Sequence, residues 1–441
     1  MHSNSNKILL SFISLGCPKN TVDSEKTLNF LAELNFNIVA DPVKSDVVIV
    51  NTCGFIEPAV NETIDVLNEM INLKKKKRNL IIIAMGCAVS REEPVLQDVL
   101  KQIDGSFPLG REKELIAFLK EKFKNIVVNA NIDKSHKRTL SITLPHYAYL
   151  KIADGCSRNC TFCTIPSIKG KYISRPMDEI IDEANSLSKR GVKELIIIAQ
   201  DTTNYGMDLY NTPKLLDLLK ELIKIDEIKW IRLMYAYPEN VTQELLDFIL
   251  ANPKFVKYID MPIQHTHSDI LTKMGRKNTF QLYDEIFSYL RKKNPDFCIR
   301  TSVITGFPGE TDEHFSHLMN YIGKVKFDRL GVFKFCREKG APAYKLDEII
   351  PESTINTRHE QLMLCQQEIH FKKNEELVGK TLNVIIDQKI GKNKFIGRTE
   401  RDAPEIDSHI IVNSHHKKIE SGNILQIKVK NYFDYDLEGT L

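Results

Sequence analysis

The sequence has almost no net charge and no long hydrophobic run. Among its 441 residues, 61 are basic and 58 are acidic, which gives a formal net charge of only +3. Apart from any local patch, this balance provides no strong electrostatic attraction to nucleic acid or to a membrane surface. No apolar stretch approaches the ~20 residues that a bilayer-spanning helix needs. We therefore expect no membrane association and no generally basic binding surface.

The sequence also lacks the cysteine pattern of a small secreted protein. Its nine cysteines are an odd number spread over a long chain, which argues against a disulfide framework. The apolar stretch that begins at Ile8 and leads to Cys17 superficially resembles a signal peptide with a lipidated cysteine. The stretch is short, and the pattern that follows it favours a first core strand of a cytoplasmic protein. With 42% hydrophobic residues, the chain has room for two or three globular domains.

The most informative feature that is present is a group of three closely spaced cysteines. Cys156, Cys160 and Cys163 have the spacing C-x-x-x-C-x-x-C. A four-iron cluster normally takes four thiolates, so a cluster held by three would keep one iron open for a small molecule. This pattern indicates a reactive site rather than an electron carrier. A structural zinc site is the alternative, but zinc favours C-x-x-C pairs, and neither His146 nor His265 lies at a suitable spacing.

Three further cysteines each follow a predicted strand near the amino terminus. The strands are expected at 8–14, 46–50 and 80–84, with helices at about 23–34, 59–73 and 92–101. The cysteines that follow them are Cys17, Cys53 and Cys87, and the glycines beside these are Gly16, Gly54 and Gly86. Strands that alternate with helices form a parallel sheet, whose carboxyl ends meet at one edge. One such cysteine is most often a buried thiol, but three in equivalent positions favour a second cluster with three protein ligands.

Strand–helix alternation resumes after residue 146 and repeats about six times. The strands are predicted at 147–153, 194–199, 230–235, 258–262, 299–305 and 329–335. The helices between them are predicted at 177–190, 213–225, 240–250, 279–293 and 311–325. Six units are fewer than the eight of a complete barrel, so we expect an open, partial (β/α)6 barrel. Its active site should lie at the carboxyl ends of the strands.

Several polar or glycine-rich segments follow these strands. Gly306, Pro308 and Gly309 belong to a turn that opens a helix, and backbone N–H groups of such a turn suit a nucleoside or a carboxylate. Alone, this segment is equally well explained as a plain turn. Gln200 opens a polar loop that is a candidate pocket wall, and Phe162 would either shield a cluster or pack in the core. These five residues are the predicted cofactor contacts, and no catalytic residue can be named.

The pattern changes after a long predicted helix at 352–377. Short strands at 381–387, 394–398, 409–412 and 423–431 predict a small β-barrel. From Gly379 to the end there are ten basic and nine acidic residues, without the basic bias of a phosphate-binding surface. A protein partner is therefore at least as credible as RNA. Residues 398–407 alternate in charge, which predicts a polar recognition loop or a solvated one.

Together, the two groups of cysteines make the chain similar to the radical S-adenosylmethionine methylthiotransferases over nearly its whole length. The resemblance implies a methylthiotransferase domain at 7–123, a radical S-adenosylmethionine domain at 142–375 and a TRAM domain at 378–441. It implies that the cofactors are two 4Fe-4S clusters and S-adenosylmethionine. Cys156, Cys160 and Cys163 would hold the cluster that cleaves S-adenosylmethionine. Cys17, Cys53 and Cys87 would hold an auxiliary cluster that handles sulfur.

Within this family, the chain resembles the RimO-type branch, which acts on a ribosomal protein. The motifs that carry the resemblance are SLGCPKN (14–20), ADGC (153–156), IKGK (168–171), AQDTTNYG (199–206), MYAYP (234–238) and DAPEID (402–407). The branch implies methylthiolation of an aspartate β-carbon in protein twelve of the small ribosomal subunit, with an electron donor and a sulfur source as further partners. The sister branch, which modifies adenosine in tRNA, usually has a different loop at 200–203. Two segments depart from the pattern: Ser408 stands where a glycine is expected, and 335–340 is unusual.

The implied chemistry explains why one chain would carry two such sites. An aspartate β-C–H is unactivated, so replacing its hydrogen with sulfur requires a radical, which the cofactor supplies while the protein excludes water. The auxiliary cluster would hold the sulfur, and a second S-adenosylmethionine would give the methyl group. Two alternatives remain at this stage: a tRNA-modifying enzyme, and a cluster carrier or RNA-binding module without enzyme activity.

Overall fold

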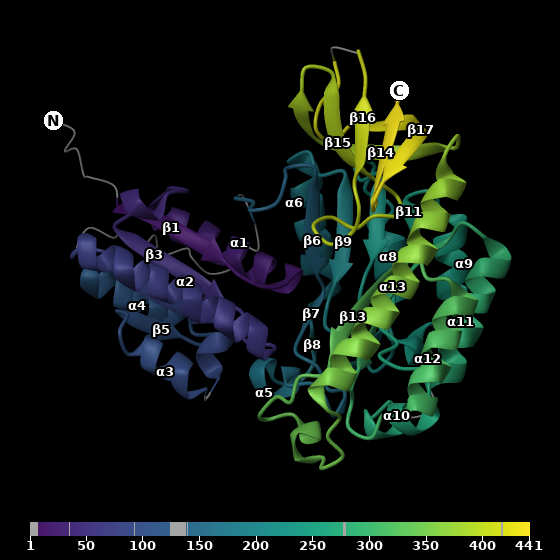
Figure 1. Ribbon diagram of the computed structural model, residues 1–441. Helices are drawn as coiled ribbons and strands as arrows, with labels where there is room; N and C mark the ends of the chain where they lie inside the picture. Colours follow the sequence, from purple (N-terminus) through teal and green to yellow (C-terminus); the bar gives the residue numbers. More distant parts are fainter. Residues whose placement is uncertain are drawn as a thin grey trace. The chain divides into compact units, whose positions relative to one another are not determined.

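The computed structural model describes residues 8–34, 36–91, 93–123, 138, 140–276, 279–415 and 418–441 (Figure 1). The chain divides into two compact units. The first comprises Met1–Ile142, Gly155–Ser157 and Thr164–Tyr172. The second comprises Thr143–Asp154, Arg158–Cys163 and Ile173–Leu441. The segment around the C-x-x-x-C-x-x-C motif therefore passes from one unit to the other.

The first unit is built on a five-stranded sheet in the order β2-β1-β3-β4-β5, and every pair of neighbours is parallel. The strands are β1 (Ile8–Ser14), β2 (Phe36–Ile38), β3 (Val47–Thr52), β4 (Ile81–Gly86) and β5 (Gly105–Phe107). The helices are α1 (Pro18–Glu33), α2 (Glu57–Lys76), α3 (Pro94–Leu100), α4 (Glu112–Lys122) and α5 (Ile165–Lys169). The three predicted strands are confirmed. The sequence did not indicate β2 and β5, which are only three residues long.

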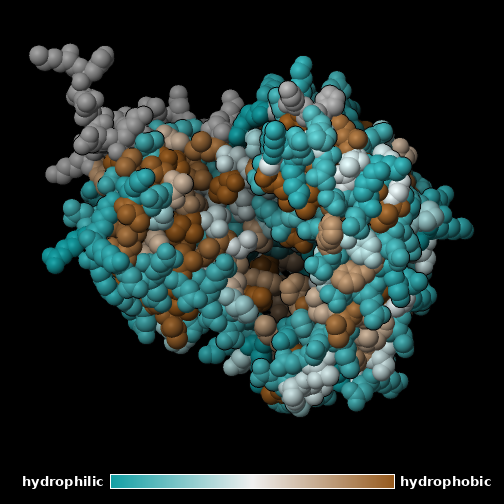
Figure 2. Space-filling view, turned by 45° about the horizontal axis from the view of Figure 1, so that its top comes forward, coloured by the Kyte–Doolittle hydropathy of each residue, from teal (hydrophilic) through white to brown (hydrophobic). Residues whose placement is uncertain are grey.

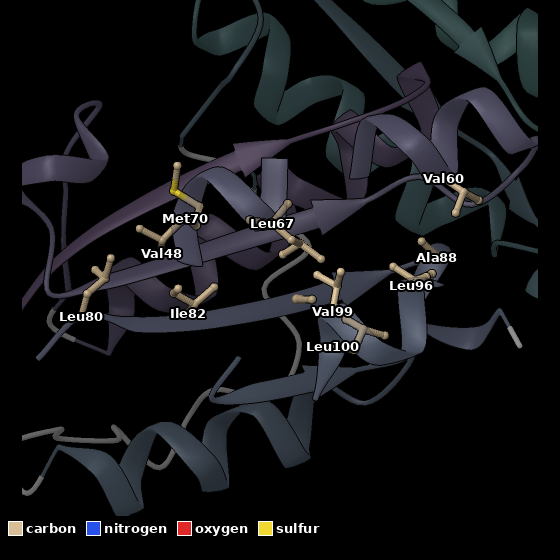
Figure 3. Close-up of a cluster of buried hydrophobic side chains, with 12 residues drawn as sticks. Val48, Val60, Leu67, Met70, Leu80, Ile82, Ala88, Leu96, Val99 and Leu100 are labelled. Carbon is tan, nitrogen blue, oxygen red and sulfur yellow. The ribbon is translucent and has the colours of Figure 1, made fainter. Parts of the chain in front are cut away.

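The central strands of this sheet are buried on both faces, which is typical of a parallel sheet between helices. Val48 and Val50 of β3 pack into a cluster with residues of α2 and α3, drawn in Figure 3. Val47 and Ile49, which alternate with them, pack into a second cluster with residues of α1 and α4. Because side chains of a strand alternate between its faces, this continuous apolar strand requires a hydrophobic layer on each side.

The second unit contains an open sheet of six parallel strands in the order β13-β12-β11-β10-β9-β6. They are β6 (Tyr147–Lys151), β9 (Glu194–Ile198), β10 (Trp230–Leu233), β11 (Phe255–Asp260), β12 (Cys298–Thr305) and β13 (Arg329–Lys334). Two short strands, β7 (Ala153–Asp154) and β8 (Ile173–Ser174), pair separately. Consecutive long strands are neighbours in the sheet, which confirms the predicted open (β/α)6 arrangement.

Helices connect these strands as the sequence predicts. They are α6 (Met177–Lys189), α8 (Leu215–Leu222), α9 (Gln243–Ala251), α11 (Thr279–Lys293) and α12 (Asp312–Val325). Two short helices, α7 (Met207–Tyr210) and α10 (Ser268–Lys273), were not predicted, because each lies inside a loop that follows a strand. The long α13 (Glu352–Leu377) has the predicted bounds and packs along β13.

The carboxyl-terminal segment forms a closed barrel in the order β14-β15-β16-β18-β17. Its strands are β14 (Thr381–Gly391), β15 (Lys394–Thr399), β16 (Ile410–Asn413), β17 (Ile424–Phe433) and β18 (Asp436–Thr440). The four predicted strands are present, and the fifth was missed. β18 closes the barrel because it pairs with β17 on one side and with β16 on the other. Closure removes the exposed strand edges that a four-stranded sheet would leave.

The loop at 398–407 packs against the amino end of the six-stranded sheet, so the alternative of a solvated loop is wrong, and a role in recognition stays a prediction. Glu405 accepts hydrogen bonds from the hydroxyls of Tyr147 and Tyr149 at 2.8 and 3.1 Å. The hydroxyl of Tyr258 donates to Asp407 at 2.9 Å. Alternating charges in this loop therefore match partners on the strands rather than solvent.

Arg398 lies at the centre of the contact between this loop and the sheet. Its side chain is 1% exposed and pairs with Glu194 of β9 at 2.7 Å and with Asp387 of β14 at 3.1 Å. Arg232 of β10 completes the group by pairing with Glu194 at 2.9 Å. Although burial alone raises the pKa of Glu194, the two guanidinium groups lower it below its ordinary value. The charges compensate one another within an interior that water does not reach.

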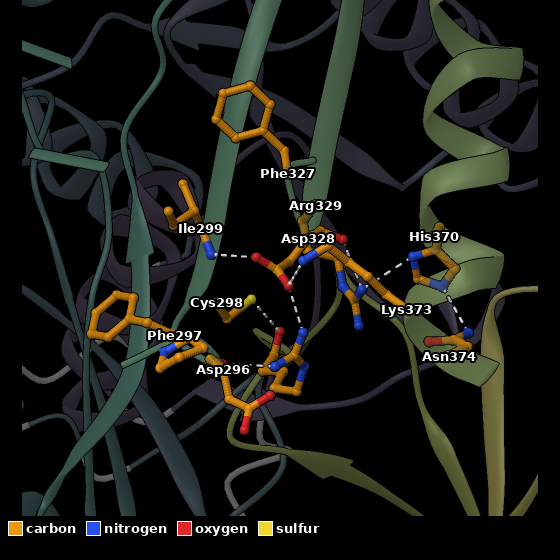
Figure 4. A network of polar contacts seen from close by, with 12 residues as sticks. Asp296, Phe297, Cys298, Ile299, Phe327, Asp328, Arg329, His370, Lys373 and Asn374 are labelled. Atoms are coloured by element: carbon orange, nitrogen blue, oxygen red, sulfur yellow. Dashed lines mark hydrogen bonds and ion pairs between the residues drawn. The ribbon is translucent and has the colours of Figure 1, made fainter. Parts of the chain in front are cut away.

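A second polar network at this end surrounds Asp328, the residue before β13 (Figure 4). Its carboxylate accepts hydrogen bonds from the Ile299 N–H at 2.9 Å, from Lys373 of α13 at 2.8 Å and from Arg401 at 2.5 Å. Arg291 of α11 is a further partner. This one carboxylate therefore links the sheet, two helices and the loop at 398–407.

On the face shown in Figure 2, hydrophobic side chains lie among hydrophilic ones. Within the described residues, no helix combines the length and the hydrophobicity needed to span a bilayer.

Candidate functional sites

The structure brings Cys17, Cys53 and Cys87 to one edge of the first sheet, as the sequence predicts. Cys17 follows β1 and precedes the first residue of α1. Cys53 and Cys87 come directly after β3 and β4. These three strands are neighbours in the sheet and parallel. Their carboxyl ends therefore lie next to one another, and the three thiols gather there.

Two residues of the SLGCPKN segment shape this edge. Gly16 has φ +88°, and a Cβ at this position would lie 2.7 Å from Cys53 Cβ and 2.8 Å from Cys53 Sγ. Asn20 donates its side-chain N–H to the carbonyls of Leu15 and Thr52, both at 3.1 Å. Its Oδ1 accepts from the Cys87 thiol at 3.5 Å. Gly16 thus leaves room for a thiol, and Asn20 ties the three strand ends together.

Burial favours the protonated form of two of these thiols, Cys53 and Cys87. Burial raises the pKa of Cys53, and it raises the pKa of Cys87 to about 12. A metal that binds here must displace the protons and take the sulfurs as thiolates. Three sulfur donors at adjacent strand ends suit an iron–sulfur cluster, and the space that Gly16 leaves open fits the same group.

The cysteines of the C-x-x-x-C-x-x-C motif are partly exposed. Cys156 lies in a turn in which its N–H donates to the carbonyl of Gly170 at 3.1 Å. Gly155, with φ +66°, allows this turn, because a Cβ there would lie 2.1 Å from the Lys171 oxygen. In the second unit, the N–H of Cys163 donates to the carbonyl of Cys160 at 3.2 Å. The donor set of three thiols, with a spacing that leaves no fourth nearby cysteine, fits a cluster with an open iron.

The stretch that contains Cys160 is fixed against neighbouring loops. The Thr161 N–H donates to the Met274 carbonyl at 3.0 Å, and its carbonyl accepts from Ala343 N–H at 2.8 Å. Gly275 has φ +72°, and a Cβ there would lie 2.4 Å from the Asn159 oxygen. These backbone contacts position the residues around Cys160.

Two arginines that sequence reasoning missed lie beside Cys160. Arg276 is buried, donates to the Tyr283 hydroxyl at 3.0 Å and hydrogen-bonds the Cys160 side chain. Its guanidinium lies 4.5 Å from the centre of the Tyr237 ring, and that of Arg158 lies 3.9 Å from the same ring. Positive charge next to a thiol stabilises the thiolate. No spacing in the sequence indicates the contact of Arg276 with Cys160, since the two residues come together only through the fold.

Gln200 and Phe162, two of the predicted cofactor contacts, differ in their surroundings. Gln200 lies after β9, at the carboxyl edge, and is partly exposed. The next residue, Asp201, accepts hydrogen bonds from Arg158 at 2.9 Å and from Thr203 at 2.8 Å. Phe162 packs against a hydrophobic cluster that includes Phe307, so its ring has an ordinary packing role. Contact of either residue with a cofactor stays a prediction.

The turn that contains Gly306, Pro308 and Gly309 is shaped by the chain itself. A Cβ on Gly306, at φ +78°, would lie 2.4 Å from Ile355, and one on Gly309, at φ +81°, would lie 2.2 Å from Glu348. The buried carboxylate of Glu310 accepts from the Gly306 N–H at 3.1 Å. Internal packing thus accounts for both glycines, and contact of the turn with S-adenosylmethionine stays a prediction.

Two residues at the carboxyl edge have a left-handed backbone that their side chains do not favour. Tyr235 has φ 58° and follows β10, and Gln264 has φ 67° and follows β11. Strained conformations of this kind persist only where the surrounding structure requires them, and they cluster at functional sites. Nothing in the sequence indicated them, because backbone dihedrals of non-glycine residues leave no local signature.

A group of His267, Asp269 and His314 also lies at this edge, with ligand atoms within 4.8 Å of one another. Both imidazoles already have a structural task. Nδ1 of His267 accepts the Asp269 N–H at the start of α10, and Nδ1 of His314 accepts the Thr311 N–H in the capping box of α12. Helix capping accounts for this arrangement without a metal ion.

The remaining cysteines were predicted to be core thiols, and this holds for one of the three. Cys298 is buried and donates to the Arg401 carbonyl at 3.3 Å. Cys336 and Cys365 are partly exposed, so the prediction is wrong for both. All nine cysteines are free, in agreement with the absence of a disulfide framework.

Three family models match the chain. The radical SAM superfamily matches residues 150–322, a family described as uncharacterized protein family UPF0004 matches 10–107, and the TRAM domain matches 378–441. The three segments agree with the three-part organisation of the fold.

Curated relatives match over nearly the full length. The ribosomal protein uS12 methylthiotransferase RimO of Carboxydothermus hydrogenoformans is 43% identical over 431 residues, which cover 97% of this chain and 98% of that protein. The protein of the same name from Thermoanaerobacter sp. is 44% identical, with coverage of 98% and 99%. The one from Clostridioides difficile is 42% identical, with coverage of 97% of each chain.

Solved structures share the fold at low sequence identity. The radical S-adenosylmethionine methyltransferase TsrM from Kitasatospora setae, with cobalamin and a [4Fe-4S] cluster bound, has a TM-score of 0.55 at 12% identity. The match covers 86% of this chain and 80% of TsrM. It supports the architecture of a parallel amino-terminal domain joined to a radical S-adenosylmethionine sheet.

Proposed function

This chain belongs to the RimO family and is a radical S-adenosylmethionine methylthiotransferase, and we propose that its substrate is ribosomal protein uS12. The methylthio group would replace a hydrogen on the β-carbon of an aspartate in that protein. The reaction would take place in the cytoplasm, with a reductant and a sulfur source as further partners. The observation that carries the proposal is the pair of three-cysteine groups, one at the carboxyl ends of the parallel strands β1, β3 and β4 and the other in the loop between β7 and α5.

We propose that each group of cysteines holds one 4Fe-4S cluster. Cys156, Cys160 and Cys163 would bind the first, and Cys17, Cys53 and Cys87 the second. When bound, the first cluster and S-adenosylmethionine supply radical chemistry for an unactivated C–H bond, and the second cluster supplies the sulfur. Because one cluster would supply the radical and the other the sulfur, the reaction requires two cluster sites, each with three protein ligands.

The protein's own residues hold and surround these groups. The guanidinium of Arg276 lies near Cys160 and is held there by its hydrogen bond to the Tyr283 hydroxyl. Asp201 pairs with Arg158, and so anchors the loop after β9 to the residues next to the motif. Glu310 fixes the turn at 306–311 through the Gly306 N–H. These contacts prepare a rigid rim at the carboxyl edge, where Gln200, Pro308 and the neighbouring glycines would meet S-adenosylmethionine.

The carboxyl-terminal barrel favours a protein substrate over tRNA. Its ten basic and nine acidic residues after residue 378 give no excess of positive charge, and phosphate binding depends on such an excess. Part of its basic complement is also unavailable, because Arg398 and Arg401 form ion pairs with the second unit's sheet.

The test is a direct competition between the two substrates. Anaerobically reconstituted enzyme is supplied with S-adenosylmethionine, reductant and sulfide, and uS12 and tRNA are offered in the same tube. Mass spectrometry of both should show a methylthio group on a uS12 aspartate and none on tRNA. Modification of tRNA alone would overturn the proposed substrate but keep the enzyme class.

A pair of variants separates the two sites within the same assay. Cys156→Ala should abolish deoxyadenosine release and product together. Cys87→Ala should keep deoxyadenosine release while losing methylthiolated uS12. Loss of deoxyadenosine release in both variants would contradict the assignment of separate tasks to the two groups.

A further inference from the structure

A lysine from the motif segment lies in the first unit, close to the strand-end cysteines. Helix α5 begins two residues after Cys163 but packs with the first unit. The Thr164 hydroxyl donates to the carbonyl of Phe55 at 3.2 Å, two residues beyond Cys53. At the other end of α5, Lys169 reaches Asp23 of α1, with 3.4 Å between Nζ and Oδ2. The helix is thus attached at one end to the loop that follows Cys53 and at the other to α1, the helix that begins after Cys17.

The ammonium group of Lys169 is buried. Its side chain is only 4% exposed, and that of Asp23 is 18% exposed. The backbone around Lys169 is fixed as well, because Gly170 closes the helix at φ +75° and its carbonyl accepts the Cys156 N–H. A lysine is almost never buried unless anionic groups compensate its charge. Asp23 supplies one such group, and Lys169 also interacts electrostatically with the thiols of Cys53 and Cys87.

The charge of Lys169 acts on two of those thiols. Burial raises the pKa of Cys53 and of Cys87. The positive charge of Lys169 has the opposite effect and lowers both pKa values. The contacts of α5 with Phe55 at one end and with Asp23 at the other place the ammonium near the strand ends rather than at a remote surface. Between the strand ends, three thiolates and an added sulfur anion would carry several negative charges out of water, which is costly without a cation.

We propose that Lys169 is a positioning residue that holds an anionic sulfur species, inorganic sulfide or a persulfide, at the open corner of the cluster on Cys17, Cys53 and Cys87. This inference rests on the proposed function, because it presumes that second cluster. The contact is a charge-assisted hydrogen bond from the ammonium to sulfur, so no bond to carbon forms or breaks in it. Lys169 also lies on α5, the short helix that follows the C-x-x-x-C-x-x-C motif in the sequence.

The experiment uses a background in which only the strand-end cluster can form, with Cys156, Cys160 and Cys163 all changed to Ala. Lys169→Met, Lys169→Arg and Lys171→Met are introduced into this background, and each protein is reconstituted anaerobically. Lys171 is the matched control, because it is exposed and only two residues away. Iron content, the reduction potential of the cluster, and the change in its electron paramagnetic resonance spectrum on titration with sulfide are measured.

We expect Lys169→Met to bind sulfide roughly 10- to 100-fold more weakly, the loss of one charge-assisted hydrogen bond. Its cluster should also be harder to reduce, since a nearby positive charge is gone. Lys169→Arg should stay within about threefold of the background, because it keeps the charge, and Lys171→Met should match the background. Equal sulfide affinity in Lys169→Met and the background would overturn the inference.

Asp23→Asn distinguishes sulfur binding from a merely structural ion pair. If Lys169 serves only to hold Asp23, this variant should weaken sulfide binding as much as Lys169→Met does, which would count against the proposal. If Lys169 acts on sulfur, releasing it from Asp23 should leave sulfide binding unchanged or strengthen it. If Lys169→Met takes up no iron, the sulfide affinity of Asp23→Asn is compared with that of the background instead, and weaker binding in Asp23→Asn counts against the proposal. Failure of the background itself to take up iron would instead contradict the second cluster of the proposed function.

Discussion

The two ends of the six-stranded sheet use polar residues in opposite ways. At the carboxyl end, polar groups belong to loops with strained backbone, such as Tyr235 and Gln264, and partly exposed cysteines lie among them. At the amino end, Arg398 and Asp328 are buried in ion pairs that join separate segments of the chain. The same strands thus present chemistry at one end and structural connections at the other, the division that is general for barrels of parallel strands.

This difference shows that buried charge and functional charge are separate properties. The largest group of buried ion pairs in the second unit lies at the end without cysteines of the motif. Lowered carboxylate pKa values do not identify the functional end, because they occur at the amino end in Glu194 and Asp328 and at the carboxyl end in Glu310. The partners of Glu194 and Asp328 are fixed and internal, which marks these two carboxylates as structural. Predictions that compare the two ends therefore separate activity from stability.

The largest effect is expected from a pair of cysteines at opposite ends of the sheet. Cys160→Ala should lower deoxyadenosine release by more than about 100-fold, since loss of a ligand exceeds the effect of losing a second-shell partner. Cys298→Ala should leave that rate within about twofold, because Cys298 only donates to a backbone carbonyl at the amino end. Anaerobic assays of S-adenosylmethionine cleavage test both. A similar loss of deoxyadenosine release in the two variants would contradict the proposed difference in function between the two ends.

The next effect concerns stability at the amino end. Arg398→Met leaves Glu194 and Asp387 buried without their shared cation, so the free energy of unfolding should fall by about 3–5 kcal/mol. Lys220→Met breaks the exposed pair with Glu244 and should cost less than about 0.5 kcal/mol. Urea unfolding followed by far-ultraviolet circular dichroism measures both. Comparable losses would mean that burial of Arg398 has no energetic consequence.

A smaller effect is expected from a glycine at the carboxyl end. Gly306→Ala combines φ +78° with a Cβ that would lie 2.4 Å from Ile355, so it should cost more than the ~1 kcal/mol of a left-handed alanine alone. Gly340→Ala, at φ +91° with no atom within 4 Å of the added Cβ, is the matched control. The difference between their urea midpoints isolates the packing contribution. No difference would show that Ile355 moves aside freely.

The helices and strands of this fold were only partly predictable from the sequence, and the reasons are physical. Helices with strong apolar periodicity, such as α6 and α12, were predicted with accurate bounds. Short β2 and β5 were missed because three residues do not establish a period. The convergence of Cys17, Cys53 and Cys87 followed from topology alone, since parallel strands have their carboxyl ends at one edge.

The residues around those cysteines were not predictable in the same way. Arg276 lies 116 positions after Cys160 in the sequence, and only the path of the chain through α10 brings them together. The loop at 398–407 looked solvated because its charges alternate, a pattern that is also produced when each charge has an internal partner. Lys169 belongs to a motif segment, but its burial beside Asp23 depends on packing that no spacing rule encodes.

The smallest effect is a dependence on pH at the amino end. Although burial alone raises it, Arg401 and Lys373 lower the pKa of Asp328 below its ordinary value. A lowered folded-state pKa contributes stability above the unfolded value of about 4, and this contribution is lost as the pH falls below it. Stability of the iron-free protein should therefore drop by roughly 1 kcal/mol or more between pH 5 and pH 3. Asp328→Asn should lack this part of the decrease, and equal slopes would argue against the assignment.

The loop at 398–407 packs against the amino end of the sheet, and this packing has a consequence for how the protein can evolve. Recombination exchanges domains most easily where few contacts cross a boundary, and the TRAM model begins at residue 378. A foreign TRAM domain joined there would have to supply partners for Glu194 and Asp328, which now pair with Arg398 and Arg401. Without them, each of these two buried carboxylates would lose one of its two guanidinium partners. The barrel and the sheet are therefore expected to be inherited as a pair, and their substitutions at these positions to accumulate together.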